Sequence, residues 1–249
     1  MTGTKHTLLK LLLACAGIAI VFFGGMIGWF FFYSRDLPDV DSLARFAPTT
    51  AAPVSDKCLP NATVAIPYDA TGANLRSALN AVGVEEGGPS FLAATYETFI
   101  HDDHFHRATL SEQVIRMLFC TPSRELRRHL EEIRTAELLD RHFSQRELFT
   151  IYANRAYFGE DLIGVQAASH MFFLKDSSDL NIAESALIAA LIKSPSYYSP
   201  LKHPDRALLR RNEVIDAMLA SGAIIAPDAE AAKGTALAIA PPHVSAKVP

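Results

Sequence analysis

The sequence predicts a mostly α-helical protein with an N-terminal transmembrane helix and at most a short β element. Three features of the 249-residue chain carry this prediction. Residues 11–33 form a charge-free apolar stretch, apolar side chains recur at helical spacing from Leu75 onward, and only residues 63–66 look like a strand. Because 49% of the residues are hydrophobic, the chain can bury a core, which excludes wholly disordered and collagen-like proteins.

The first element is the stretch 11–33, which is long enough to cross a bilayer. A bilayer core needs about 20 helical residues, whereas the apolar part of a cleaved signal peptide has about 7–15. The stretch ends in an aromatic run at 29–33, typical of a membrane interface, and Lys5 and Lys10 precede it. We therefore expect an uncleaved signal anchor, with residues 1–10 in the cytoplasm and the rest of the chain outside.

The exported body, residues 34–249, is acidic. It carries 21 basic and 27 acidic side chains, a net charge of −6, and so gives no support for a nucleic-acid-binding protein held by bulk charge. Cys58 and Cys120 are the two cysteines outside the predicted span. An oxidising compartment would allow them to pair, but the sequence leaves open whether they are close enough.

The remaining elements follow from periodicity and breaker residues. Residues 34–60, with several prolines, predict an extended linker. A capping box of Ser144 and Glu147 opens one helix, and Gly222 closes the last one. In chain order we expect helices near residues 75–82, 91–100, 110–119, 124–141, from 145 onward, 182–192 and 208–219.

The longest informative stretch is residues 147–200. A motif of a tyrosine, an asparagine and a Tyr-Phe-Gly triplet is followed by a Lys, a Glu and two prolines at characteristic spacings. The residues concerned are Tyr152, Asn154, Tyr157, Phe158, Gly159, Gly164, Ala167, Ala168, Phe173, Lys175, Leu180, Glu184, Ala186, Pro195 and Pro200. On these residues the stretch resembles the glycosyltransferase domain of penicillin-binding proteins, the family 51 peptidoglycan glycosyltransferases. A later Arg-Arg-Asn helix at 210–212 extends the resemblance, which covers roughly residues 40–230.

The resemblance implies a lysozyme-like fold over residues 61–230, followed by a C-terminal tail at 231–249. It also implies an activity, the polymerisation of lipid II into glycan strands. In this reaction a Glu base activates the acceptor 4-hydroxyl, and undecaprenyl pyrophosphate leaves. The implied location is the inner membrane with a periplasmic domain, and other cell-wall synthesis or division proteins are possible partners.

The second motif of the family resembles G-G-S-T-I-T-Q-Q-L-x-K-N and falls here on residues 107–117. Thr109, Ser111 and Gln113 match, Glu112 adds a negative charge, and Arg116 stands where a phosphate-binding Lys is usual. An Arg can hold a pyrophosphate as well as a Lys can. The resemblance implies substrate contacts at Thr109, Ser111, Gln113, Arg116, Asn154 and Gly159.

The third motif resembles R-K-x-x-E and is matched by Arg128, His129 and Glu132, with His129 in the Lys position. The resemblance implies that Arg128 and His129 contact the substrate and that Glu132 is the second catalytic carboxylate. The alternative is that Glu132 only pairs with Arg128 across one helical turn, at i, i+4 spacing.

The first motif, which carries the general base, is the poorest match. After the lead-in 78–82 the chain continues as Gly-Val-Glu-Glu-Gly-Gly-Pro, without the Glu-Asp pair, Phe and His of the family. Glu85 is the best candidate base, and Glu86 stands where the substrate-binding Asp would be. A second alignment would place Thr95 at the base position. An exposed acidic turn without a role is the structural alternative for Glu85 and Glu86.

Two classes of function therefore remain. One is an active glycosyltransferase, with a divalent cation such as Mg²⁺ or Mn²⁺ possible at the pyrophosphate. The other is a catalytically impaired relative that binds lipid-linked precursor or scaffolds cell-wall synthesis enzymes. The shortened first motif, Glu112 and His129 favour the second class.

Overall fold

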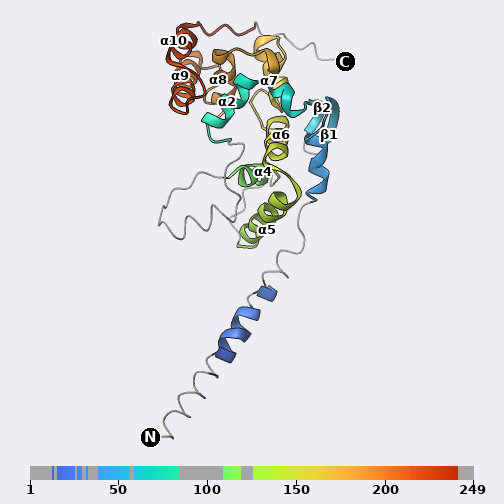
Figure 1. Ribbon diagram of the computed structural model, residues 1–249. Coiled ribbons are helices and arrows are strands. Elements are labelled where there is room, and N and C mark those ends of the chain that lie inside the picture. The colour runs from blue at the N-terminus through green and yellow to red at the C-terminus, as the bar shows by residue number, and fades with distance from the viewer. Residues whose placement is uncertain are drawn as a thin grey trace, which may run out of the picture. The chain divides into compact units, whose positions relative to one another are not determined.

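The computed structural model describes residues 39–56, 59–84, 109–118 and 126–240, together with Leu13, 16–25, 27–29 and Phe32 (Figure 1). Of residues 52–56, 59–63, 118, 126–131, 133 and 134 it describes the backbone alone. The chain divides into two compact units. One is formed by residues 1–38 and 121–135, and the other by residues 39–120 and 136–249.

In the first unit, the described residues between 13 and 32 are helical and solvent-exposed, and their apolar side chains include Val21 at 75% and Ile20 at 73% exposure. Within the described stretches, no helix has both the length and the apolar character that a membrane span requires. The transmembrane helix over 11–33 therefore stays a prediction. The first unit also contains the beginning of helix α5 (Leu126–His142).

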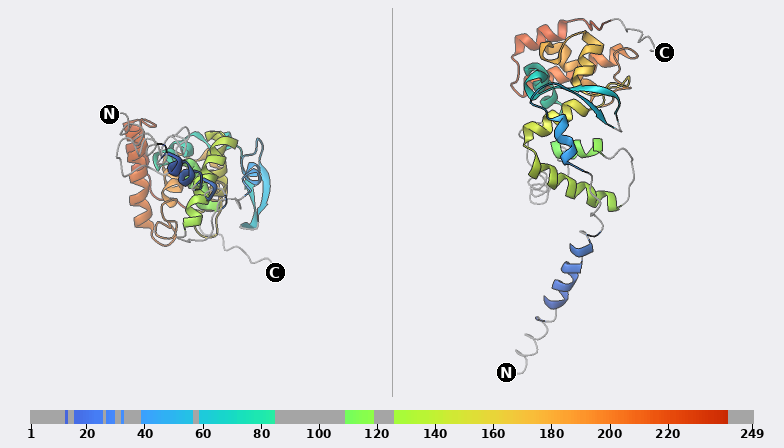
Figure 2. Two further views of the ribbon diagram at one scale, coloured as in Figure 1. Left: turned by 90° about the horizontal axis from the view of Figure 1, so that it is seen from below. Right: turned by 90° about the vertical axis from the view of Figure 1, so that its right-hand side faces the viewer.

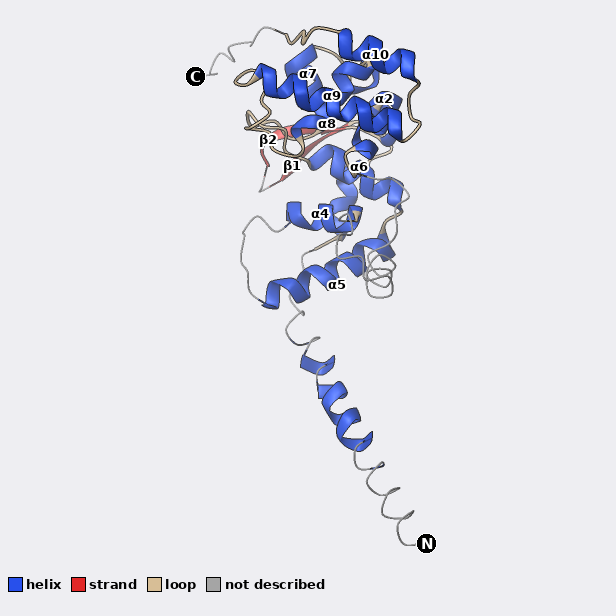
Figure 3. Cartoon of the chain, turned by 90° about the vertical axis from the view of Figure 1, so that its left-hand side faces the viewer, coloured by secondary structure: helices blue, strands red, loops and turns tan. Residues whose placement is uncertain are grey.

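The second unit is mostly helical, as the sequence predicts (Figure 3). Its α-helices include α2 (Ala73–Ala81), α4 (Leu110–Leu118), the end of α5, α6 (Gln145–Arg155), α7 (Val165–Phe173), α8 (Ile182–Leu191), α9 (Pro204–Ala220) and α10 (Ala226–Gly234). Short 3₁₀ helices lie at η1 (Asp41–Phe46), η2 (Tyr68–Thr71) and η3 (Ser177–Asp179). The helix expected near 91–100 lies outside the described residues, and periodicity alone did not indicate α7 and α10.

The β element is a two-stranded hairpin rather than a single strand. Strand β1 (Ala52–Asp56) pairs antiparallel with β2 (Leu59–Ala65), with Ala52 opposite Ala65, and the hairpin lies at the edge of the unit (Figures 1 and 2). The predicted strand at 63–66 is the end of β2. Both strands are edge strands, and an edge strand can accommodate a proline such as Pro53.

The prediction that residues 34–60 form an extended linker is therefore wrong for the described residues of this range. Besides β1, it contains η1, whose Leu43 and Phe46 are 1% and 0% exposed. These two side chains lie three residues apart on one face of the short helix and join the core, so the folded unit begins near residue 39 rather than near 61.

Helix α8 lies at the centre of the core. Ala183 and every residue from 185 to 191 are buried, as expected for a helix that is apolar on all sides. Its N-terminus is closed by a capping box in which Asn181 and Glu184 each accept the other's backbone N–H at 2.9 Å. Helices α2 and α9 pack against it (Figure 2).

The C-terminal segment is held to the same unit by a buried arginine. Arg211 of α9 is 1% exposed and donates to the carbonyl oxygens of Lys233 at 3.0 Å and Thr235 at 2.8 Å. The N–H of Ala240 donates to the carbonyl of Phe172 at 2.7 Å. Residues 231–240, which we expected to be a tail, are thus attached to the domain.

Candidate functional site

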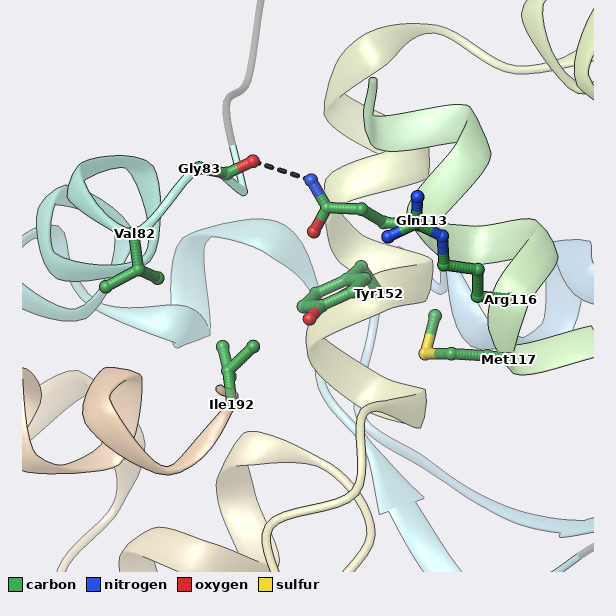
Figure 4. Close-up of a pocket in the computed structure, with 7 residues that line it drawn as sticks. All are labelled: Val82, Gly83, Gln113, Arg116, Met117, Tyr152 and Ile192. Carbon is green, nitrogen blue, oxygen red and sulfur yellow. Dashed lines mark hydrogen bonds between the residues drawn. The ribbon is translucent and has the colours of Figure 1, made fainter. Parts of the chain in front are cut away.

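A cavity of about 490 Å³ lies in the second unit, where the end of α2, helices α4 and α6, and the end of α8 meet (Figure 4). This volume is in the range of small-molecule sites. The described residues that line it are Val82, Gly83, Gln113, Arg116, Met117, Tyr152 and Ile192.

Helix α4 supplies the polar side of the cavity. Gln113, Arg116 and Met117 are spaced i, i+3 and i+4, so they share one face of the helix. Arg116 is exposed and forms no ion pair with any residue that the structure describes. Since no carboxylate is among the described lining residues either, the cavity favours an anionic ligand.

Gln113 fixes the rim of the cavity. Its side-chain amide donates to the carbonyl oxygen of Gly83 at 2.6 Å (Figure 4). Gly83 has φ +95° and ends α2 in a Schellman motif, in which Val84 donates to Leu79 and Gly83 to Asn80, both at 3.0 Å. Val84 is 1% exposed. The direction in which the chain leaves the rim is therefore set by three hydrogen bonds and one buried side chain.

Tyr152 of α6 lies at the centre of the lining residues (Figure 4). It is 7% exposed, and its hydroxyl has no hydrogen-bond partner among the described residues. Burial raises the pKa of Tyr152 to about 12, an effect that the positive charge of Arg116 partly opposes. The phenol is therefore protonated and neutral at physiological pH.

Helix α6 holds Tyr152 in place because its start is fixed as the sequence predicts. Ser144 and Glu147 form the expected capping box, with hydrogen bonds of 3.3 and 2.8 Å. The side chains of 148–155 are all buried, so the helix is packed on every side along most of its length.

Of the predicted substrate-binding residues, Gln113 and Arg116 line the cavity, whereas Thr109 and Ser111 are buried at the N-terminus of α4. Thr109 accepts the N–H of Glu112 at 3.3 Å, and the Glu112 carboxylate accepts the N–H of Thr109 at 2.7 Å, which is a capping box. The Ser111 hydroxyl lies 3.0 Å from that of Thr109. These side chains stabilise the start of the helix, and the substrate contacts expected of Thr109 and Ser111 stay a prediction.

Asn154 and Gly159 also serve the fold. The Asn154 amide donates to the carbonyl oxygens of Phe46 and Ile66 and accepts the N–H of Ile66, each at 2.8 Å, and the residue is 3% exposed. Gly159 has φ +86°, and a β-carbon there would lie 3.1 Å from Cβ of Pro195. The amide of Asn154 is thus taken up by the surrounding backbone, which argues against its predicted substrate contact. The steric limit at Gly159 concerns an added β-carbon, so the substrate contact expected of Gly159 stays a prediction.

The predicted catalytic residues fall mostly outside the described residues. Glu85 and Glu86 lie there, as do Thr95, Cys58 and Cys120. For Arg128 and His129 only the backbone of α5 is described. Glu132 is half-buried on the same helix, in the first unit.

Sequence reasoning missed Tyr152 as a site residue, together with the apolar lining of Val82, Met117 and Ile192. A signal was present for Tyr152, which matches the family pattern two residues before Asn154. In the part of the chain that the structure describes, no group of three or more His, Cys, Asp or Glu residues could hold a metal ion.

Comparison with known proteins gives a consistent family. A family model described as Transglycosylase matches residues 90–219, slightly more than half of the chain. Penicillin-binding protein 1F of Bacillus subtilis is 37% identical over 132 residues, 53% of this chain and 18% of that protein. Penicillin-binding protein 1A of Aquifex aeolicus is 31% identical over 238 residues, 86% of this chain and 32% of that protein.

The chain spans less than a third of the length of these two relatives. A crystal structure of penicillin-binding protein 1A from Haemophilus influenzae covers 52% of this chain and 16% of that chain, at 27% identity and a TM-score of 0.35. A TM-score of this size is too low to establish a shared fold, so the family assignment depends on the sequence matches.

Proposed function

Because this chain belongs to the transglycosylase family, the peptidoglycan glycosyltransferases, we propose that it polymerises lipid II into glycan strands. One observation carries the proposal beyond the family. The cavity combines a cation, Arg116, that has no ion pair with the described residues, with a rigid rim at Gly83, two residues before Glu85 in the sequence. A cation and a carboxylate are the two charges that this reaction requires.

Arg116 is the proposed ligand of the diphosphate. As the bond between the sugar C1 and the diphosphate breaks, negative charge grows on the leaving diphosphate, and a guanidinium stabilises it by charge-assisted hydrogen bonds. Among the described residues, Arg116 has no ion pair that would have to break when it binds the diphosphate.

The proposed general base is Glu85, with Glu86 as the alternative. The acceptor 4-hydroxyl must lose its proton as it attacks C1, and positioned carboxylates typically accelerate such steps by about 10²–10⁴-fold. The anchored rim at Gly83 and Val84 supports this assignment, since Glu85 follows Val84 directly in the sequence. Glu132 is the proposed second carboxylate on the strength of the motif alone.

A divalent cation is a weaker part of the proposal. The described lining offers no carboxylate to ligate Mg²⁺ or Mn²⁺, so charge neutralisation at the diphosphate is assigned to Arg116 and no step depends on a metal.

The proposed location is the inner membrane, with residues 11–33 as a single-pass anchor, the N-terminus in the cytoplasm and the domain in the periplasm. The exposed apolar side chains of the described helical residues, such as Phe22 at 67% and Ile18 at 71%, support insertion into lipid. A tethered domain would meet lipid II at the membrane surface, where other cell-wall synthesis or division proteins could bind it.

Polymerisation of labelled lipid II by the purified full-length protein in detergent tests the activity. We expect glycan chains from the wild type and their loss, by at least about 100-fold, in Glu85→Gln and Glu132→Gln. The matched control for Glu132 is Glu137→Gln on the same helix, since Glu137 forms only a surface pair with Arg141. Loss in Glu86→Gln rather than in Glu85→Gln would move the base by one residue.

The second candidate function is a relative that binds precursor without polymerising it. The observation in its favour is that Thr109, Ser111 and Asn154 are committed to the fold, which leaves fewer substrate ligands than the motif suggests. Lipid II binding without any glycan product from the wild type would establish this function and exclude the first.

A further inference from the structure

The Tyr152 side chain is largely buried, but its hydroxyl is not sealed inside the protein. The side chain is 7% exposed, and no described residue accepts from or donates to its hydroxyl. Tyr152 lines the cavity, so its hydroxyl is available to a ligand that enters the cavity.

The surroundings of Tyr152 decide the chemistry of that partner. Arg116 is close enough for its charge to act on the phenol, and the other described lining residues are uncharged. Gln113, the other polar side chain, donates to the carbonyl of Gly83. A ligand that contacts both residues meets the cation of Arg116 and the neutral hydrogen-bond donor of Tyr152. This pair suits an anion with several oxygen atoms.

Tyr152 is suited to donate rather than to accept a proton. Its pKa of about 12 keeps the proton on the phenol at neutral pH, so it is a poor general base. A neutral O–H donor adds no charge to the site, and its hydrogen bond strengthens as negative charge accumulates on the acceptor.

We infer that the Tyr152 hydroxyl is a binding group for the diphosphate held at Arg116 and donates a hydrogen bond to one of its oxygens. This inference rests on the proposed function for the identity of the substrate. It extends that function by a second diphosphate ligand from a different helix, so that α4 supplies the charge and α6 a neutral donor.

Inorganic pyrophosphate is a probe that separates binding from catalysis. Its affinity for the full-length protein in detergent is measured by titration calorimetry for the wild type, Tyr152→Phe and Arg116→Gln. We expect Tyr152→Phe to weaken binding about tenfold, the usual effect of removing one hydrogen bond to a charged group. Tyr157→Phe is the matched control, since Tyr157 follows the same helix but is 49% exposed and does not line the cavity.

Wild-type affinity in Tyr152→Phe, or no pyrophosphate binding by the wild type at millimolar concentrations, would overturn the inference. A merely structural role is excluded if Tyr152→Phe unfolds at the wild-type temperature and yet binds more weakly. If the wild type fails to polymerise lipid II but its pyrophosphate binding depends on Tyr152, the proposed function fails and the inference stands.

With active protein, the kinetics give a second readout. A diphosphate contact that strengthens as the bond breaks predicts that Tyr152→Phe lowers kcat more than it raises KM. A change in KM alone would assign Tyr152 to the bound lipid without a role in its departure.

Discussion

Two side chains of α6, Tyr152 and Asn154, stand two positions apart in the same family pattern and do opposite things. The Asn154 side-chain amide donates hydrogen bonds to the carbonyls of Phe46 and Ile66 and accepts one from the N–H of Ile66. Tyr152 leaves its hydroxyl without a described partner, on the lining of the cavity. A motif can therefore mix residues that hold the chain with residues that bind a ligand, and only the hydrogen-bond partners tell them apart.

Helix α4 repeats the contrast along its axis. At its N-terminus, Thr109 and Glu112 form the reciprocal hydrogen bonds of a capping box. In its last turn, Arg116 has no ion pair among the described residues. If the contrast is correct, changes at Asn154 and Thr109 reduce stability, while removal of the Tyr152 hydroxyl does not at neutral pH.

The largest expected effect is that of Asn154→Ala. The change leaves two carbonyls and one N–H buried without partners, and each costs about 1–3 kcal/mol, so we expect a loss of about 4 kcal/mol in the free energy of unfolding. Urea denaturation measures it. Asn74→Ala is the control, since the Asn74 amide makes a single bond to the Leu180 carbonyl and should cost about 1 kcal/mol. Equal losses at the two sites would break the comparison.

Tyr152→Phe should be silent near pH 7 and visible in alkali. The folded pKa of about 12 lies above the ordinary value of 10, so between these pH values the unfolded state loses the proton first. Wild-type stability therefore falls as pH rises from 10 to 12, by up to about 2 kcal/mol more than that of the variant. Unfolding curves at pH 7 and 11.5 check this. Parallel pH profiles for both proteins would mean that the phenol titrates as if exposed.

Thr109→Ala should cost about 1 kcal/mol in the free energy of unfolding, the usual effect of losing an N-cap side chain. Thermal or urea unfolding measures the loss. If Thr109→Ala were as stable as the wild type, the Thr109 hydroxyl would not be needed to cap the helix and would be available to a substrate, as the motif suggested.

The smallest effect is expected from Glu112→Gln, which restores the residue usual in the family. Gln also serves in a capping box, so the free energy of unfolding should change by less than about 0.5 kcal/mol. The same urea titration measures it. A loss as large as that of Thr109→Ala would mean that the charge of Glu112, and not only its hydrogen bond, stabilises the helix.

The sequence predicted local features of the fold better than distant contacts. The capping box of Ser144 and Glu147 and the helices α4, α5, α8 and α9 lie where periodicity and caps placed them. The strand β1 was missed because its pairing with β2 depends on a chain reversal, and Pro53 and the neighbouring polar residues resemble a linker. Leu43 and Phe46 gave a short helical signal that the surrounding prolines obscured.

For the site, the family motif was informative at some positions and not at others. It indicated Gln113 and Arg116, which lie on one face of α4 and line the cavity. Asn154 was assigned to the substrate because a polar residue in a motif looks the same whether its partner is a ligand or a distant carbonyl. The partners of Asn154 lie 108 and 88 positions away in the chain, and no local pattern reports them.

The contacts of Asn154 also set an order of events during synthesis. Residues 46 and 66 are made first, and their shared partner follows 88 to 108 residues later. At about 5–20 residues per second the ribosome needs roughly 4–20 s to reach it. During that interval η1 and the hairpin cannot complete their native hydrogen bonds, so the N-terminal end of the domain is expected to finish folding after α6, although it is the first part to be made.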